Sequence, residues 1–136
     1  MSYARAAAWA GVLAMLAAMP GCRDAGGPEP ITPGTAVVSL ASAATDGAIL
    51  MRVTGPGFST PQAVSSDAVL YWRQNSESEI VVAVFGAVTN GPVFRVDVPD
   101  TRNIGRYQAT VLQVADRSST ERTDLTSYGA HVTAAQ

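Results

Sequence analysis

Cysteine, histidine and lysine are almost missing from the chain. Its 136 residues include one cysteine, Cys22, and one histidine, His131, and every basic residue is an arginine. Schiff-base chemistry and a phosphate-binding lysine loop are therefore excluded. A disulfide within the chain is excluded too, and one histidine with one cysteine makes a zinc site improbable. The net charge of −2 comes without a basic stripe, so we expect no nucleic-acid partner.

Only one apolar run is long. It covers residues 6–19, follows a start with one positive charge, and leads through Pro20 and Gly21 to Cys22. This layout is typical of a secretory signal. Its 14 residues fall short of the roughly 20 that a membrane-spanning helix needs. A lipoprotein signal, a plain secretory signal and an ordinary buried cysteine remain the alternatives, although the Gly/Pro-rich surroundings of Cys22 offer no core.

Residues 19–22 resemble the lipobox of bacterial lipoproteins, with Met19 where that family favours leucine and Pro20 where it favours a small residue. The resemblance implies cleavage after Gly21 and a diacylglyceryl group on the Cys22 thiol. Two acyl chains are enough for a stable membrane anchor. Arg23 stands where an aspartate is the usual retention signal. By that analogy we expect the outer membrane of the cell envelope, with the domain extracytoplasmic.

Composition divides the chain into three parts. We expect a lipoprotein signal peptide at 1–21, a lipidated Cys22 with a Gly/Pro-rich tether at 22–34, and one folded domain at 35–136. A domain of this size outside the cytoplasm that lacks disulfides depends on its core alone.

The folded part is predicted to be all-β, a single antiparallel β-sandwich of about seven strands. Runs of Val, Ile, Thr and aromatic residues alternate with Gly, Pro, Asn, Asp and Ser, and no stretch has a convincing helical period. Asp46-Gly47 is a hairpin signal, and Gly55-Pro56-Gly57 ends a strand. The predicted strands are 36–42, 48–54, 68–74, 79–85, 92–98, 106–115 and 126–132.

Alternation assigns the faces of these strands. Ile49, Met51 and Val53 share one face, and so do Phe94, Val96 and Val98. The strand 79–85 is apolar on both faces and should be central. In 106–115 the inward set shifts by one residue after Val111, which predicts a β-bulge.

Residues 103–111, read as N-I-G-R-Y-Q-A-T-V, resemble the tyrosine corner of immunoglobulin-like domains. The resemblance implies that the Tyr107 hydroxyl bonds to upstream backbone and that Trp72 is the core tryptophan of the fold. Asn103 and Ala109 replace the aspartate and the second cysteine of that pattern. A fainter likeness is to the cohesin-type sandwiches of polysaccharide-handling systems. Both imply a sandwich, and neither assigns a function.

Catalytic and metal-binding residues are few. His131 lies in the last predicted strand and is more typical of a surface residue than of a catalytic base. A calcium site could be built from Asp97, Asp100 and Asn103, or from Asp116, Glu121 and Asp124, but Asp and Asn are also ordinary turn residues. We therefore expect no cofactor, no metal and no catalytic residue.

The candidate binding residues are Tyr71 and Arg73. Adjacent strand residues point to opposite faces, so we expect Leu70 and Trp72 inward and Tyr71 and Arg73 outward. An exposed tyrosine beside an arginine can stack on a sugar or anchor a protein interface. Alternatively, the ring merely lies on the sheet. The polar run 116–124 is either a solvated loop or a partner contact.

The leading hypothesis is a lipid-anchored, non-enzymatic binding module of the bacterial cell envelope with a protein or glycan ligand. It rests on the clear secretory signal at the N-terminus and on the small number of residues that could be catalytic. One alternative is a structural or assembly subunit that pairs through strand edges. Another is a small hydrolase with His131 as its base.

Overall fold

The computed structural model describes residues 26–136, which form eight strands and one short 3-10 helix. Gly, Pro, Asn, Asp or Ser residues stand at the ends of the strands or in the connections between them, as the sequence pattern predicts. The strands are β1 (Gly34–Ala41), β2 (Asp46–Thr54), β3 (Gln62–Ala63), β4 (Val69–Ser76), β5 (Glu79–Val88), β6 (Gly91–Val98), β7 (Gln108–Ala115) and β8 (Gly129–Ala134), with the helix η1 (Thr101–Arg106) before β7.

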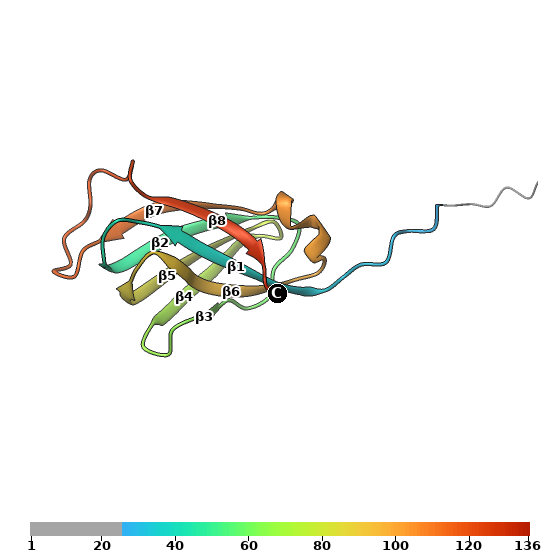
Figure 1. Cartoon of the computed structure of the whole chain (residues 1–136), viewed down its shortest axis with the longest axis horizontal. Coiled ribbons are helices and arrows are strands. Elements are labelled where there is room, and N and C mark those ends of the chain that lie inside the picture. Colours follow the sequence, from blue (N-terminus) through green and yellow to red (C-terminus); the bar gives the residue numbers. More distant parts are fainter. Residues whose placement is uncertain (1–25) are drawn as a thin grey trace, which may run out of the picture.

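The strands form two four-stranded antiparallel sheets that pack face to face (Figure 1). One sheet has the order β3-β6-β1-β8, and the other has the order β4-β5-β2-β7. The predicted all-β sandwich is thus confirmed, and each of the seven predicted strands is present. The two-residue strand β3 is additional. The start predicted at residue 106 was wrong by two residues, because η1 occupies that position.

The connection between β1 and β2 corrects one prediction. Asp46-Gly47 was expected to turn a hairpin, but β1 and β2 lie in different sheets and the chain crosses between them. Asp46 is the first residue of β2 and is completely buried. A Cβ at Gly47 would come within 2.7 Å of the Asp116 carbonyl oxygen, so glycine allows this close approach.

The core lies between the sheets and consists of the alternate residues assigned from the sequence. Ile49, Met51 and Val53 of β2 are buried, and they belong to the same core cluster as Phe94, Val96 and Val98 of β6 in the other sheet. Strand β5 is an inner strand of its sheet, as its apolar character on both faces predicts.

A β-bulge in β7 is also confirmed. Leu50 pairs with Gln113, whereas the next residue, Met51, pairs with Val111, so Leu112 is the extra residue. Val111 and Val114 are three positions apart, and residues at that spacing face opposite sides of a regular strand. The bulge allows both of them to face the interior.

Tyr107 joins two distant parts of the chain. Its ring is buried, and its hydroxyl donates a 2.8 Å hydrogen bond to the carbonyl oxygen of Gly57. The acceptor is upstream backbone, as the tyrosine-corner resemblance implies, but it lies 50 positions away in the β2–β3 connection. The ring also packs edge-on against Phe58 at a centroid distance of 5.5 Å.

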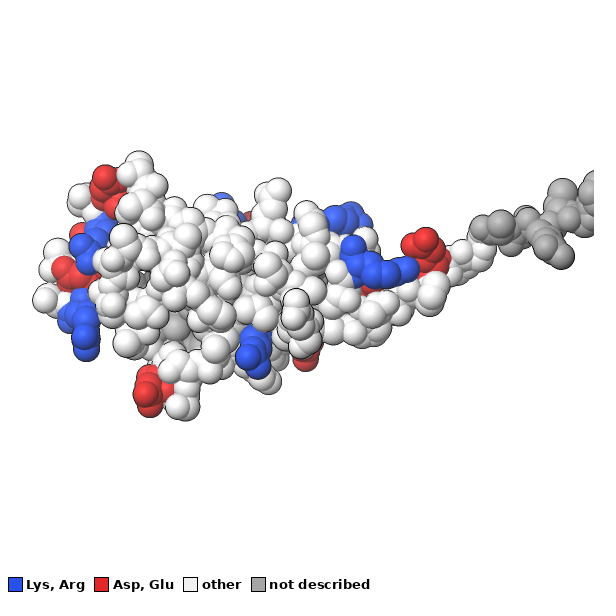
Figure 2. All heavy atoms as spheres, viewed as in Figure 1, with Lys and Arg blue, Asp and Glu red and all other residues white. Residues whose placement is uncertain are grey.

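The two ends of the sandwich differ. Residues 26–33 and the C-terminus lie at one end, together with η1, and the long β7–β8 loop lies at the other (Figure 1). On the face shown in Figure 2, charged side chains gather mostly towards these two ends. We call the end with the β7–β8 loop the distal end.

Candidate functional site

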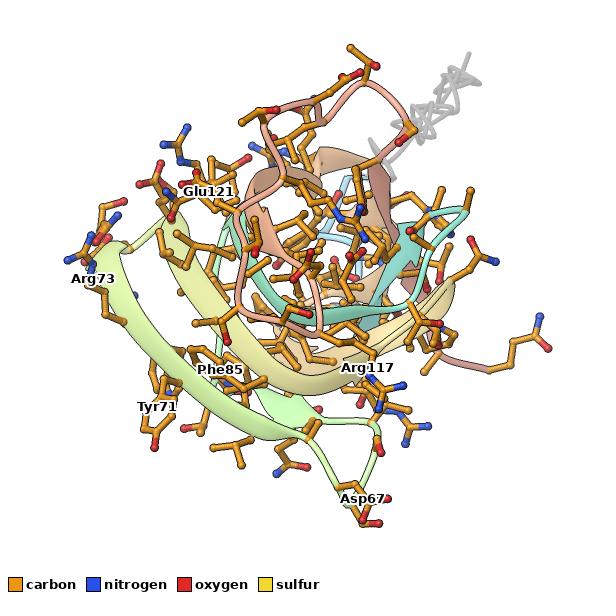
Figure 3. The ribbon with its side chains drawn as sticks, turned by 90° about the vertical axis from the view of Figure 1, so that its left-hand side faces the viewer. Asp67, Tyr71, Arg73, Phe85, Arg117 and Glu121 are labelled. Atoms are coloured by element: carbon orange, nitrogen blue, oxygen red, sulfur yellow. The ribbon has the colours of Figure 1, made fainter. Side chains whose placement is uncertain are left out.

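Apolar side chains are exposed on the outer face of β4 and β5. Val69, Tyr71 and Phe85 are 52%, 64% and 46% exposed. Val69 pairs with Phe85 across the two strands, and the Tyr71 ring meets the Phe85 ring edge-on with centroids 6.0 Å apart. Diagonal neighbours on one sheet face interact in this way. We call these three residues the aromatic patch; Tyr71 and Phe85 are labelled in Figure 3.

A shallow hollow of about 290 Å³ adjoins the aromatic patch on the same sheet. Its floor is made of small residues of three strands, and short side chains are what leave the space open. Phe85 stands at one side, and the β7–β8 loop forms the other. The lining includes Ala48, Leu50, Ala83, Phe85, Gln113, Ala115, Ser119 and Glu121.

The loop wall of the hollow is ordered by its own hydrogen bonds. The Asp116 carboxylate accepts hydrogen bonds from the backbone amides of Ser118 and Thr120, at 2.8 and 3.0 Å. These bonds lower the pKa of Asp116 below its usual value. Ala115 and Glu121 form a β-bridge. The run 116–124 is therefore an ordered loop at the distal end, and most of its residues are exposed to solvent.

A buried polar cluster fixes the far side of that loop. Asp46 accepts hydrogen bonds from the Arg122 guanidinium at 2.9 Å and from the Tyr128 hydroxyl at 2.7 Å. Burial raises the pKa of Tyr128, and its hydrogen bond to Asp46 adds to the effect. The sequence offers no signal for this cluster, because its members lie 76 and 82 positions apart.

Arg73 points outward from β4, as expected, and is exposed. It pairs in register with Val81 and lies on the same outer face as Tyr71. Among residues 26–136 it forms no ion pair, whereas nearby Arg52 lies 3.7 Å from Glu79. The structure thus brings Tyr71 and Arg73 together on one face and adds Phe85, which the sequence analysis did not single out.

Trp72 is not a core residue, and that prediction was wrong. It pairs with buried Val82, so its face is inward as expected, yet 38% of it is exposed. The reason is that β4 is an edge strand and the opposite sheet ends in β3, which has only two residues. The opposite sheet, β3-β6-β1-β8, is too narrow at this edge to cover the indole ring of Trp72.

The other candidates remain separate from the aromatic patch. His131 is an exposed residue of β8, in register with Ser39 of β1. Asp97 accepts a hydrogen bond from the Thr35 hydroxyl at 2.7 Å. Within residues 26–136 no group of three or more His, Cys, Asp or Glu side chains could hold a metal ion. Cys22 lies outside the described residues.

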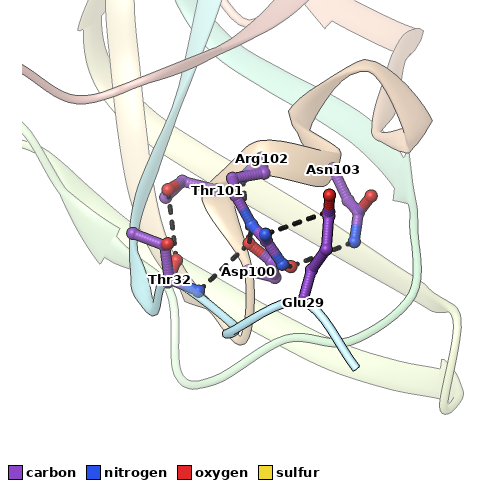
Figure 4. Close-up of polar contacts among 6 residues, drawn as sticks. All are labelled: Glu29, Thr32, Asp100, Thr101, Arg102 and Asn103. Atoms are coloured by element: carbon purple, nitrogen blue, oxygen red, sulfur yellow. Dashed lines mark hydrogen bonds and ion pairs between the residues drawn. The ribbon is translucent and has the colours of Figure 1, made fainter. Parts of the chain in front are cut away.

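A second polar cluster holds the chain that leads into β1 (Figure 4). Buried Asp100 accepts hydrogen bonds from Arg102 at 2.8 Å and from the Thr32 amide at 3.2 Å. The Thr32 carbonyl accepts in turn from the Thr101 amide at 2.8 Å. The hydrogen bonds from Arg102 are the main cause that holds the pKa of Asp100 far below its usual range. The exposed Glu29 also pairs with Arg102, at 3.2 Å.

In the described part of the chain, no helix is long and apolar enough to cross a bilayer. Comparison with protein-family models, with curated proteins and with solved structures gave no match.

Proposed function

We propose that the chain is a lipid-anchored, non-enzymatic binding module of the bacterial cell envelope, with a protein or glycan ligand. The observation that carries the proposal is the aromatic patch beside the hollow on the outer face of one sheet. Aromatic and arginine side chains that stay exposed on a rigid scaffold are typical of binding surfaces.

The volume of the hollow limits the size of the ligand group that it can hold. About 290 Å³ lies at the lower limit of small-molecule sites and suits one side chain or one sugar ring. The neighbouring Tyr71 offers a flat ring for stacking, and Arg73 offers a charged donor. The ligand therefore combines an apolar group with a hydrogen-bond acceptor or an acid.

The placement of the hollow agrees with a lipid on Cys22. The chain joins the sandwich at Gly34, at the end opposite the β7–β8 loop that walls the hollow (Figure 1). A membrane anchor on the N-terminal side leaves the distal end facing away from the bilayer. The lipid itself is inferred from the lipobox resemblance at residues 19–22.

The test is capture of envelope components by the full chain in detergent. Tyr71→Ala and Phe85→Ala should each lower capture about tenfold with little change in melting temperature, because both residues are exposed. Arg95→Ala, on the outer face of the other sheet, is the control and should capture normally. Unchanged capture by both patch variants would refute the proposed surface. A hydrolytic activity lost in His131→Ala would favour the enzyme reading instead.

The edge of β4 favours a second function, that of an assembly subunit joined to other envelope chains. This edge is eight residues long and belongs to the terminal strand of its sheet. An open strand edge is a template for pairing with another chain.

A further inference from the structure

The four sheet edges of the sandwich are unequally protected. Strand β3 is an edge of only two residues. Strands β7 and β8 lie beside each other along one side of the sandwich, and the Ala115–Glu121 bridge covers the end of β7. Strand β4 has no such cover. It is thus the longest uncovered edge in the described part of the chain, with eight residues against the six of β8.

The backbone of β4 is paired on one side only. Its residues 69–76 pair with β5. No other hydrogen bond recorded among residues 26–136 involves a backbone amide or carbonyl of these residues. A row of amide and carbonyl groups therefore faces outward along the edge, at the spacing of an extended polypeptide.

The side chains of β4 do not protect this edge in the usual ways. The strand has no proline, and its only register shift lies near its end, between Gln74 and Ser76. Apolar surface is exposed on both faces, from Tyr71 outward and from Trp72 inward. Arg73 is the single charged residue of the strand.

We propose that the edge of β4 binds an extended segment of another protein, which adds to the sheet as a further strand. Only a polypeptide presents amides and carbonyls at the spacing that the open ladder requires. Consecutive residues of the segment would point to opposite faces, so that one apolar side chain would cover Trp72 and its neighbour would contact Tyr71. An acidic side chain of the segment would face Arg73, which lacks an ion pair among the described residues.

A second copy of this chain fits the edge less well. Antiparallel pairing is the commoner arrangement of neighbouring strands. An antiparallel copy would turn its own Gly34 end in the opposite direction from that of the first copy. The N-terminal segments of the two chains would then leave the pair at opposite ends, so both could not easily reach anchors in one membrane. The occupant is therefore assigned as a segment of an unlike chain.

This inference rests on the proposed binding function and names the class of ligand and the mode of binding. The probe is a library of random peptides displayed on phage and selected on the full chain in detergent. Enriched peptides are synthesised, and their affinity is measured against the unchanged chain, Arg73→Glu and the control Arg95→Glu. Residue-resolved amide hydrogen exchange then locates the peptide on the sandwich.

Strand addition predicts enriched peptides with two neighbouring apolar residues, one for each face of the sheet, beside an acid. Alternate β4 amides should exchange at least about tenfold more slowly in the complex. Arg73→Glu should weaken binding about tenfold, Arg95→Glu by less than about twofold, and N-methylation of alternate peptide amides should abolish binding.

Three outcomes would overturn the inference. One is the absence of enriched peptides, and another is peptide binding that leaves β4 exchange unchanged. The third is concentration-dependent self-association that protects β4 in the absence of peptide, which would make the occupant a second copy. Loss of envelope capture in Tyr71→Ala and Phe85→Ala would still support the proposed function in the first two cases, so the two failures are distinguishable.

Discussion

Asp46 and Arg122 form an ion pair, at 2.9 Å, between the first residue of β2 and the β7–β8 loop. The Asp46 side chain is completely buried, whereas 38% of the Arg122 side chain remains accessible. Tyr128 completes the cluster by donating its hydroxyl to the second carboxylate oxygen. One buried acid thus anchors the loop that walls the hollow, and the shape of the hollow depends on it.

The first prediction concerns Tyr128→Phe. Removing the hydroxyl leaves one oxygen of buried Asp46 without its hydrogen bond, which should lower the free energy of unfolding by about 1–3 kcal/mol. Tyr71→Phe is the matched control. It removes a hydroxyl from a tyrosine that is 64% exposed and should leave the stability unchanged. Urea unfolding of the two variants measures both effects, and equal losses would contradict the anchoring role of Asp46.

The second prediction concerns the stability of the fold at acidic pH. Hydrogen bonds hold the pKa values of Asp100, Asp116 and Asp124 below their ordinary value of 3.8. The folded state therefore binds protons less readily than the unfolded state. This contribution to stability is complete well above pH 3.8, and it is lost as the pH falls through 3.8 towards the folded values.

Asp100→Asn isolates the largest of these contributions. The variant should be less stable than the unchanged chain near neutral pH, and its stability should fall less steeply below about pH 4. Thermal unfolding across a pH series measures the slope. Parallel pH profiles for the two chains would show that Asp100 does not carry the acid dependence.

The third prediction concerns Gly55, which follows β2 and contacts the Tyr107 ring. A methyl group at position 55 would overlap that ring. Gly55→Ala should therefore cost about 1–3 kcal/mol, because the buried tyrosine must shift from its packed position. Gly105→Ala is the control, since a Cβ there meets nothing within 4 Å. A neutral Gly55→Ala would indicate that the Tyr107 ring moves freely.

The fourth prediction concerns Trp72→Ala. A fully buried tryptophan costs about 3–5 kcal/mol when it is replaced by alanine. Trp72 is 38% exposed at the sheet edge, so we expect a smaller loss of about 1–2 kcal/mol in denaturant unfolding. A loss in the range for a fully buried tryptophan would mean that another chain, or a second copy, covers the indole under the conditions of the experiment.

The fifth prediction concerns the anchor. Cys22→Ser should abolish acylation and leave the precursor uncleaved by the lipoprotein peptidase, because only a thiol forms the thioether. Detergent phase partitioning and the mass of the N-terminal peptide measure the two effects. Normal cleavage together with unchanged partitioning of the variant would refute the lipoprotein assignment.

Local patterns predicted the fold because each strand carries its own signal. Ile49, Met51 and Val53 occupy alternate positions of β2, with Arg52 and Thr54 on the other face, and the phase shift after Val111 is visible in the sequence as a bulge. These signals extend over a few residues. The side of β4 that carries Tyr71 and Arg73 was predicted in the same way.

The site was only partly predictable because it depends on neighbours that are distant in sequence. Phe85 belongs to the aromatic patch through its register with Val69. Asp46 reads as a turn residue, and its burial follows from Arg122 and Tyr128 far downstream. The exposure of Trp72 depends on the width of the opposite sheet, which ends at β3. Strand periodicity reveals the face of a residue but not the extent of the facing layer.

Hydrogen bonds join Thr32 to Asp100 and Thr101, and they fix the point at which the N-terminal segment meets the sandwich. With a lipid on Cys22, ten residues separate the bilayer from this fixed point, and fully extended they reach about 35 Å. A sandwich built on strands of eight residues adds about 27 Å. With that lipid in place, the hollow would stand no more than about 60 Å above the membrane surface, and a partner would have to come within that height to meet it.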